Sequence, residues 1–270
     1  MSAPPPFTIA LCEGYHDRSF LAGALVERLG WEEPGLEADG RRKPWQDRWG
    51  QVAGGDFGYV HPETRAQIRL RPCGGHTKVP VAVQKVLQGR ATRPFDRLLV
   101  NYDGDKGGDG PDYLARIHGS VRDLLVRSGA EPEIVSEGRF LIDGGARSVD
   151  VMVWRCDGPP REGVPAQQCL ERVLCTAAAA VWPDRMASVG RWLRERPEPT
   201  TRVSGDAEGA PPTIAKSHGW TLMAGWFADH GCDDFLKQVW RSPMRDALEK
   251  LLVESGAWAT LDSCRGVETR

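Results

Sequence analysis

Two acidic residues separated by a single glycine follow a short apolar run near the middle of the sequence. They are Asp103 and Asp105, which come after Leu98–Val100 in the segment FDRLLVNYDGDKGG. Residues i and i+2 of an extended chain point to the same side, so we expect both carboxylates to face one point. Two like charges at that distance repel each other unless a cation or a proton lies between them. A hard divalent cation such as Mg²⁺ suits carboxylate oxygens, whereas DGD alone is also typical of a polar surface turn.

A third carboxylate, near the start of the chain, also follows directly after an apolar segment. The apolar segment FTIALC, residues 7–12, predicts a buried strand, and Glu13 and Gly14 follow it directly. Apolar residues at helical spacing between Phe20 and Leu29 then predict a helix, in which Asp17 is a first-turn or capping residue. Open α/β sheets bind their ligands at the carboxyl ends of the strands, so Glu13 and Asp103 are expected at the same edge.

The remaining pattern predicts the elements that position these carboxylates. Residues 57–60 and 66–71 resemble the arms of a hairpin, and a helix follows with Val81, Val83, Val86 and Leu87 on its apolar side. An amphipathic helix is expected over 113–128, and residues 132–157 contain short strands. Residues 7–157 therefore predict an α/β domain with a mainly parallel sheet flanked by helices. Residues 166–262 predict an α-helical C-terminal region that packs on it.

With the three carboxylates placed, the chain resembles the TOPRIM family, whose fold is shared by topoisomerases, bacterial primases and OLD-type nucleases. The segment CEGYHDRSFL is similar to the first family motif, a Glu at the end of the first strand. The segment LLVNYDGDKGG is similar to the second, a D-x-D at the end of the third strand, and especially to its primase version. The motifs keep the family's order, about ninety residues apart, and the resemblance covers about residues 7–130. The helical tail resembles small bacterial TOPRIM-like proteins, in the segment AKSHGWTLMAGWFADHGCDDF.

The resemblance implies phosphoryl transfer on DNA or RNA that depends on Mg²⁺ or Mn²⁺. In this interpretation Glu13, Asp103 and Asp105 hold one or two cations, which orient a phosphodiester and activate a water. Lys216 is a candidate catalytic residue that contacts a phosphate. The chain lacks a Walker-type motif and the zinc and polymerase regions of a primase, so we expect a small nuclease that acts in defence or repair. The alternative is a TOPRIM module that binds nucleic acid or protein without chemistry.

Other residues carry weaker signals. Lys106 is as well explained by a solvated turn as by a phosphate contact, and His218 is a less favoured proton-transfer group. We interpret His16 and His76 as surface or structural residues, and Glu171 as an ordinary helix charge, with a position facing the cleft as the alternative. Three tryptophans are assigned to helix packing: Trp220, Trp226 and Trp240.

Composition limits the class of protein. The 270 residues are 40% hydrophobic and 27% charged with a net charge of -2, so no overall basic field exists to attract nucleic acid. No apolar run could cross a bilayer and the N-terminus resembles no secretory signal, so we expect a cytoplasmic protein. The seven cysteines form no C-x-x-C pair, which agrees with a reducing compartment. The sequence leaves open whether the chain binds a protein partner or forms a homo-oligomer.

Overall fold

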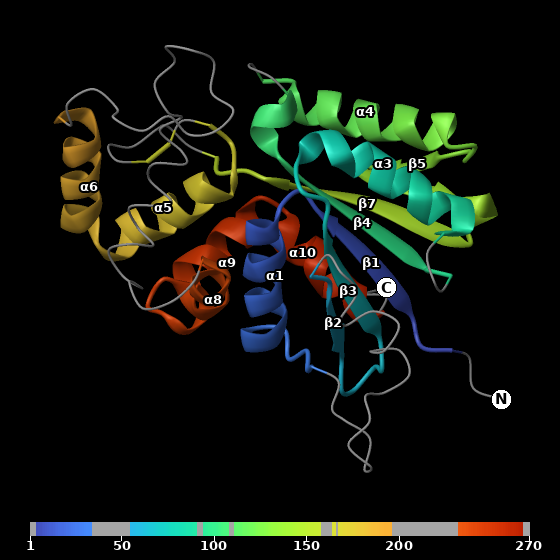
Figure 1. Ribbon diagram of the computed structural model, residues 1–270, viewed down its shortest axis with the longest axis horizontal. Coiled ribbons are helices and arrows are strands. Elements are labelled where there is room, and N and C mark those ends of the chain that lie inside the picture. The colour runs from blue at the N-terminus through green and yellow to red at the C-terminus, as the bar shows by residue number, and fades with distance from the viewer. Residues whose placement is uncertain are drawn as a thin grey trace.

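The chain is built on one seven-stranded sheet. A computed structural model describes residues 4–33, 55–90, 94–107, 111–157, 164–165, 167–195 and 232–266. The strand order is β2-β3-β1-β4-β7-β6-β5 (Figure 1). The strands are β1 (Phe7–Cys12), β2 (Phe57–Val60), β3 (Gln67–Pro72), β4 (Arg97–Asp103), β5 (Glu133–Ser136), β6 (Arg139–Ile142) and β7 (Arg147–Trp154). The inner strands β3, β1, β4 and β7 run parallel, while β2, β6 and β5 pair antiparallel at the edges. The expected α/β class with a mainly parallel core is confirmed, and the antiparallel edges make the sheet mixed.

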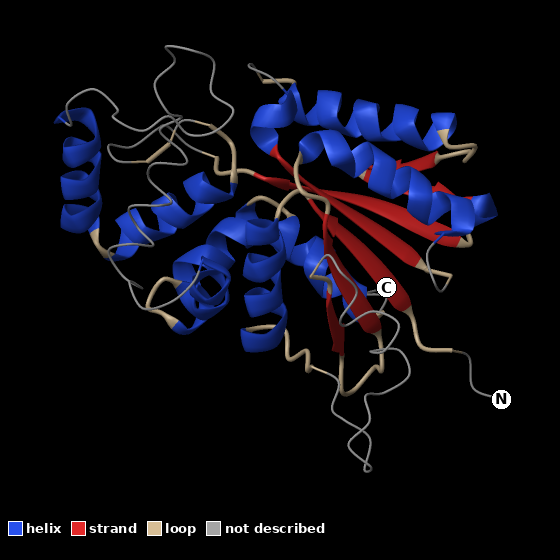
Figure 2. Ribbon diagram, viewed as in Figure 1, coloured by secondary structure: helices blue, strands red, loops and turns tan. Residues whose placement is uncertain are grey.

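Helices cover both faces of this sheet (Figure 2). They are α1 (Tyr15–Glu27), α3 (Val79–Lys85), α4 (Tyr113–Arg127), α5 (Leu170–Val181), α6 (Pro183–Glu195), α8 (Cys232–Gln238), α9 (Arg245–Glu254) and α10 (Ala257–Asp262). Short helical turns include η1 (His76–Lys78), η3 (Gly104–Gly107), η5 (Val239–Arg241) and η6 (Ser263–Arg265). Among the helices that the structure describes, none is both long enough and apolar enough to cross a membrane.

The central strands are apolar on both sides because each side meets a helical layer. In β4, Leu98 and Val100 pack with α3 and α4, while Leu99 between them packs into the core on the opposite face. This second core contains α1 and the C-terminal helices, and Figure 1 shows α3 and α4 on the side of the sheet away from α1. Full burial of successive residues is the pattern expected of a parallel strand between two layers.

The C-terminal helices share one core with the sheet. Trp240 is buried as expected, and its indole N–H donates a 2.9 Å hydrogen bond to the carbonyl oxygen of Phe20 in α1. The Phe20 ring also lies 5.4 Å, centroid to centroid, from the ring of Trp154 at the end of β7. These contacts join segments far apart in the sequence, so the helical region packs directly on α1 and the sheet.

Two local expectations are wrong, and several fall outside the described residues. Val81 is 51% exposed, because α3 begins at Val79 and directs Val79 and Val83 into the core. Asp105 does not continue the strand, because β4 ends at Asp103 and the helical turn η3 begins at Gly104. Four of the candidate residues lie outside the described residues: Lys216, His218, Trp220 and Trp226.

Candidate functional site

The ends of β1 and β4 bring two of the predicted carboxylates together. These strands are parallel neighbours, with Leu11 opposite Val100, so both chains leave the sheet at the same edge. Glu13 follows β1 directly, and its Oε2 accepts a hydrogen bond of 3.4 Å from the backbone N–H of Asp103. The backbone N–H of Gly75 donates to the carbonyl oxygen of Glu13 at 2.8 Å, which ties the turn after β3 to the same place. Residues ninety positions apart in the sequence therefore meet at one edge of the sheet, as expected of residues that follow neighbouring parallel strands.

Asp105 reaches this edge by a different geometry from the one expected. Asp103 is the last residue of β4, and the chain bends into the helical turn η3 at Gly104. The alternation of an extended strand therefore ends before Asp105, whose side chain is exposed and whose N–H donates to the carbonyl oxygen of Gln168 at 2.8 Å. The expectation that Asp103 and Asp105 point to the same side as strand residues is wrong. Asp105 is nevertheless close enough to help raise the pKa of Asp103.

The N-terminus of α5 completes the site from the C-terminal half of the chain. The first N–H of this helix, on Leu170, donates to Oδ1 of Asp103 at 3.2 Å, because the leading N–H groups of a helix have no partner within it. The half-buried Glu171 follows in the first turn, and its charge raises the pKa of both Asp103 and Asp17. Sequence analysis favoured an ordinary helix charge for Glu171, and the structure instead places it at the acidic site.

Asp17 is a fourth acidic group, held by two directional hydrogen bonds. Its Oδ2 accepts the N–H of Gly14 at 2.7 Å, which confirms the predicted capping role. Its Oδ1 accepts the indole N–H of Trp154 at 2.6 Å. Burial raises the pKa of Asp17 to about 6, opposed by these two hydrogen bonds and increased further by the charges of Glu13 and Glu171.

The electrostatics of the site centre on Asp103. Burial raises the pKa of this carboxyl well above its usual range, and the neighbouring charges of Asp17, Glu13, Glu171 and Asp105 raise it further, in that order. A carboxylate in this environment is stabilised by either a proton or a cation. Within the described part of the chain, no three His, Cys, Asp or Glu side chains lie in the geometry of a metal site. Glu13 and Asp103 instead accept hydrogen bonds from backbone N–H groups.

Positive charge lies beside the acidic group at the end of β3. Asp56 is buried between two arginines: it pairs with the buried Arg69 and lies 3.1 Å from Nε of Arg71, whose side chain is 34% exposed. Burial raises the pKa of Cys73, the residue after β3, and Arg71 opposes that rise while Glu13 adds to it. The Cys73 thiol therefore lies close enough to both Arg71 and Glu13 for each to act on its pKa. The sequence predicted this strand as one arm of a hairpin, but Arg71 was not among the candidate residues.

The weaker candidates are placed as follows. His76 is exposed on η1, in agreement with the surface role expected of it, and His16 lies in the first turn of α1. The backbone of Lys106 belongs to η3, and its side chain is outside the described structure.

Comparison with known proteins identifies the fold and no activity. No family model and no curated protein sequence matches the chain. Among solved structures, the crystal structure of a hypothetical protein from Pyrococcus horikoshii OT3 is similar, with a TM-score of 0.64 and 15% sequence identity. The match covers 96% of this chain and 99% of the archaeal one. The class defined by fold and site is thus an α/β protein with an acidic group at the carboxyl edge of its sheet. At this identity the likeness extends to the architecture alone.

Proposed function

We propose that the chain is a TOPRIM-like enzyme that hydrolyses phosphodiester bonds of nucleic acid with the help of Mg²⁺ or Mn²⁺. The observation that carries the proposal is the meeting of Glu13 and Asp103 at adjacent ends of parallel strands. The family resemblance assigns the metal-binding carboxylates to these positions and to Asp105. Charge supports the proposal as well, because the pKa of Asp103 is raised by four other carboxylates around it.

The donor set fits a hard divalent cation. Glu13, Asp103 and Asp105 supply carboxylate oxygens, which Mg²⁺ and Mn²⁺ prefer, and Glu171 and Asp17 add negative charge nearby. To hold one ion together, Glu13 and Asp103 must exchange their backbone N–H partners for the metal. The two residues already meet at this edge, because Oε2 of Glu13 accepts a hydrogen bond from the backbone N–H of Asp103. A bound cation would polarise the phosphodiester and activate a water for attack.

A binding module without chemistry is the second candidate. The hydrogen bond from the α5 N-terminus to Asp103 favours it, since a carboxylate can be kept to organise a helix. The enzyme is preferred because capping a helix needs one carboxylate, whereas five interact here. Bringing further like charges close to Asp103 costs folding free energy, which a purely structural role leaves unexplained.

Cleavage assays test the proposal directly. The purified chain is incubated with supercoiled plasmid, linear duplex, single-stranded DNA and RNA, each with Mg²⁺, Mn²⁺ or EDTA. We expect cleavage of at least one substrate with metal and none with EDTA. Loss of a metal-binding carboxylate in Asp103→Ala should lower the rate by at least about a hundredfold, since the cation supplies several kcal/mol of transition-state stabilisation.

The matched control is Asp123→Ala, which removes an exposed carboxylate from α4 in the opposite helical layer. Its rate should equal that of the wild type. Absence of cleavage with every substrate and metal, or equal rates for Asp103→Ala and the wild type, would leave the binding module as the better account.

A further inference from the structure

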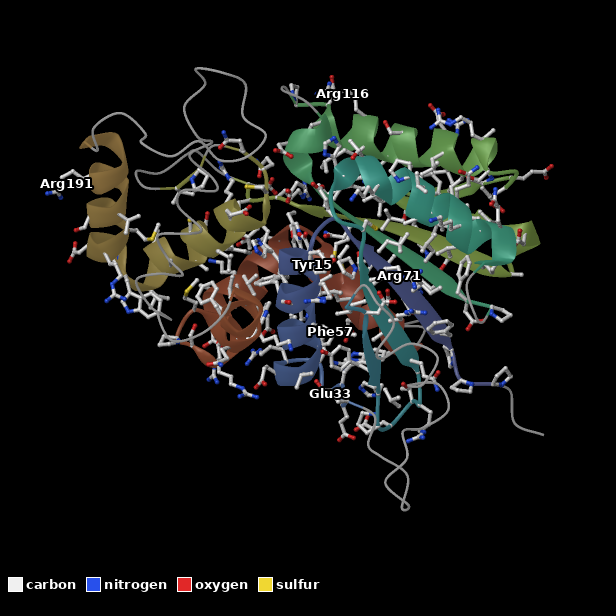
Figure 3. The ribbon with its side chains drawn as sticks, in the orientation of Figure 1. Tyr15, Glu33, Phe57, Arg71, Arg116 and Arg191 are labelled. Atoms are coloured by element: carbon white, nitrogen blue, oxygen red, sulfur yellow. The ribbon has the colours of Figure 1, made fainter. Side chains whose placement is uncertain are left out.

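One aromatic side chain is exposed beside the acidic site. Tyr15 is the first residue of α1, two positions after Glu13, and half of its surface is accessible. Two residues of chain span about 7 Å at most, so the Cα atom of Tyr15 lies within about that distance of the Cα atom of Glu13. Within the described ranges, Tyr15 is the aromatic member of the exposed large hydrophobic residues, while the others are valines and an isoleucine. Figure 3 shows Tyr15 at the start of α1, above Phe57, which is the first residue of β2.

Contacts beneath the ring fix its position. The guanidinium of Arg18 lies 5.2 Å from the centroid of the Tyr15 ring and 3.9 Å from that of Phe57. Arg18 is buried and also donates hydrogen bonds to the carbonyl oxygen of Gly55 and, at 3.3 Å, to the hydroxyl of Ser19. A cation at this distance attracts an aromatic face, so the buried arginine holds the exposed ring in place. Less side-chain entropy is then lost when a ligand stacks on it.

We propose that Tyr15 stacks against an unpaired base of the nucleic acid whose phosphate occupies the acidic site. This inference names the substrate class of the proposed function and rests on it. Base–aromatic stacking tolerates any sequence but requires an exposed base face. The substrate is therefore a single strand, or a duplex with unpaired bases near the bond to be cleaved.

The charge of the site favours stacking over further ionic contacts. The charges that raise the pKa of Asp103, those of Asp17, Glu13, Glu171 and Asp105, also repel a polyanion. A tyrosine ring is uncharged, so its affinity for a base is not offset by that repulsion. Bases inside an intact duplex are stacked on each other and must be extruded at a cost of a few kcal/mol before they reach the ring.

Binding measured without metal and without cleavage tests this inference separately from the proposed function. The host is the double variant Asp103→Asn/Asp105→Asn, which removes two charges and prevents metal-dependent turnover. Fluorescence anisotropy in EDTA then follows a labelled single strand of mixed sequence, as DNA and as RNA, and the corresponding blunt DNA duplex. Tyr15→Ala in this host should bind single strands about 5- to 150-fold more weakly, the range for loss of one stacked base.

Two comparisons make the result specific. Tyr15→Phe keeps the ring and should retain the affinity of the host, and Val126→Ala removes an exposed apolar side chain from α4 as a control. Affinity for the blunt duplex should not change with any of these substitutions. The inference is overturned if the host does not bind single strands, if Tyr15→Ala binds them as well as the host, or if duplex affinity falls by the same factor. Stacking with no Mg²⁺-dependent cleavage by the wild type would retain this inference and reject the enzyme.

Discussion

At the scale of single residues, Asp103 is the position where the proposed function and the stability of the fold oppose each other. Its carboxyl is surrounded by other acidic side chains, and its pKa is raised well above the usual range, chiefly by burial. The folded chain therefore binds this proton more tightly than the unfolded chain does. Stability from this group is complete below the unfolded pKa of about 4 and is lost as the pH rises through the folded pKa.

This linkage predicts that Asp103→Asn flattens the dependence of stability on pH. Asparagine carries no charge, and its Oδ1 can still accept the N–H of Leu170. As the pH rises from about 4 through the raised pKa of Asp103, the wild type should lose more thermal stability than the variant. Each unit of pKa shift corresponds to about 1.4 kcal/mol, or about 3–6 °C in Tm for a chain of this size. Differential scanning fluorimetry across this range measures the effect.

Asp123→Asn is the control, since it neutralises an exposed carboxylate on α4. Its pH profile should follow that of the wild type. Parallel profiles for Asp103→Asn and the wild type would mean that the neighbouring charges do not act on Asp103 in solution. Under the proposed function, Mg²⁺ should also raise the Tm of the wild type more than that of Asp103→Asn.

At the scale of elements, the close approach of η3 to the segment before α5 positions Asp103 and Asp105. The backbone at Gly104 leaves no room for a side chain. A Cβ there would lie 2.7 Å from Cβ of Gln168, 3.0 Å from the carbonyl oxygen of Trp154 and 3.0 Å from Cε2 of Tyr113. The glycine of the DGD motif is thus required by packing, not by an unusual backbone angle.

We predict that Gly104→Ala destabilises the fold by about 1–3 kcal/mol, the usual range for overpacking. The turn must move away from Gln168, so the hydrogen bond from Asp105 N–H to that residue should weaken too. Urea unfolding followed by circular dichroism measures the change. Gly119→Ala in α4 is a matched control, because its Cβ would meet open space and it should stabilise the helix by about 0.5–1 kcal/mol. Equal effects of the two substitutions would contradict the packing argument.

At the scale of the whole molecule, local patterns predicted the sheet better than they predicted the site. The apolar runs before Glu13 and Asp103 identified β1 and β4, because burial on both faces leaves a continuous apolar segment. The predicted meeting of these residues followed from parallel topology and is confirmed. The position of Glu171 at the acidic site was only the less favoured alternative, because it depends on α5 docking at the sheet edge, which no local pattern encodes.

The position of Asp105 could not be predicted from the two-residue alternation of a strand. Strand alternation predicted a side chain on the same side as Asp103, whereas the chain leaves the strand at Gly104. The glycine itself was the available signal, since glycine in an apolar-to-polar transition often marks a close backbone approach. Tyr15 carried no comparable signal, because its exposure depends on Arg18 and Phe57 beneath it.

The shared core predicts that the C-terminal helices and the sheet unfold together. Gly23 of α1 faces α8 and η5 so closely that a Cβ would lie 2.5 Å from Cδ1 of Trp240 and 2.6 Å from the carbonyl oxygen of Lys237. Backbone atoms cannot rotate away as a side chain can, so Gly23→Ala must separate α8 from α1. We expect it to lower the free energy of unfolding by about 3 kcal/mol, at the upper end of the range for overpacking.

A single cooperative transition should persist in this variant, since one core joins both regions. Denaturant unfolding followed by tryptophan fluorescence and by far-ultraviolet circular dichroism measures both the midpoint and the number of steps. Val26→Ala, a partly exposed position on α1, should leave the midpoint within about 0.5 kcal/mol of the wild type. Two separated transitions in the wild type would mean that the helical region is an independent unit. The acidic site would then depend on docking of α5 as well as on folding of the sheet, because Leu170 and Glu171 reach Asp103 from that region.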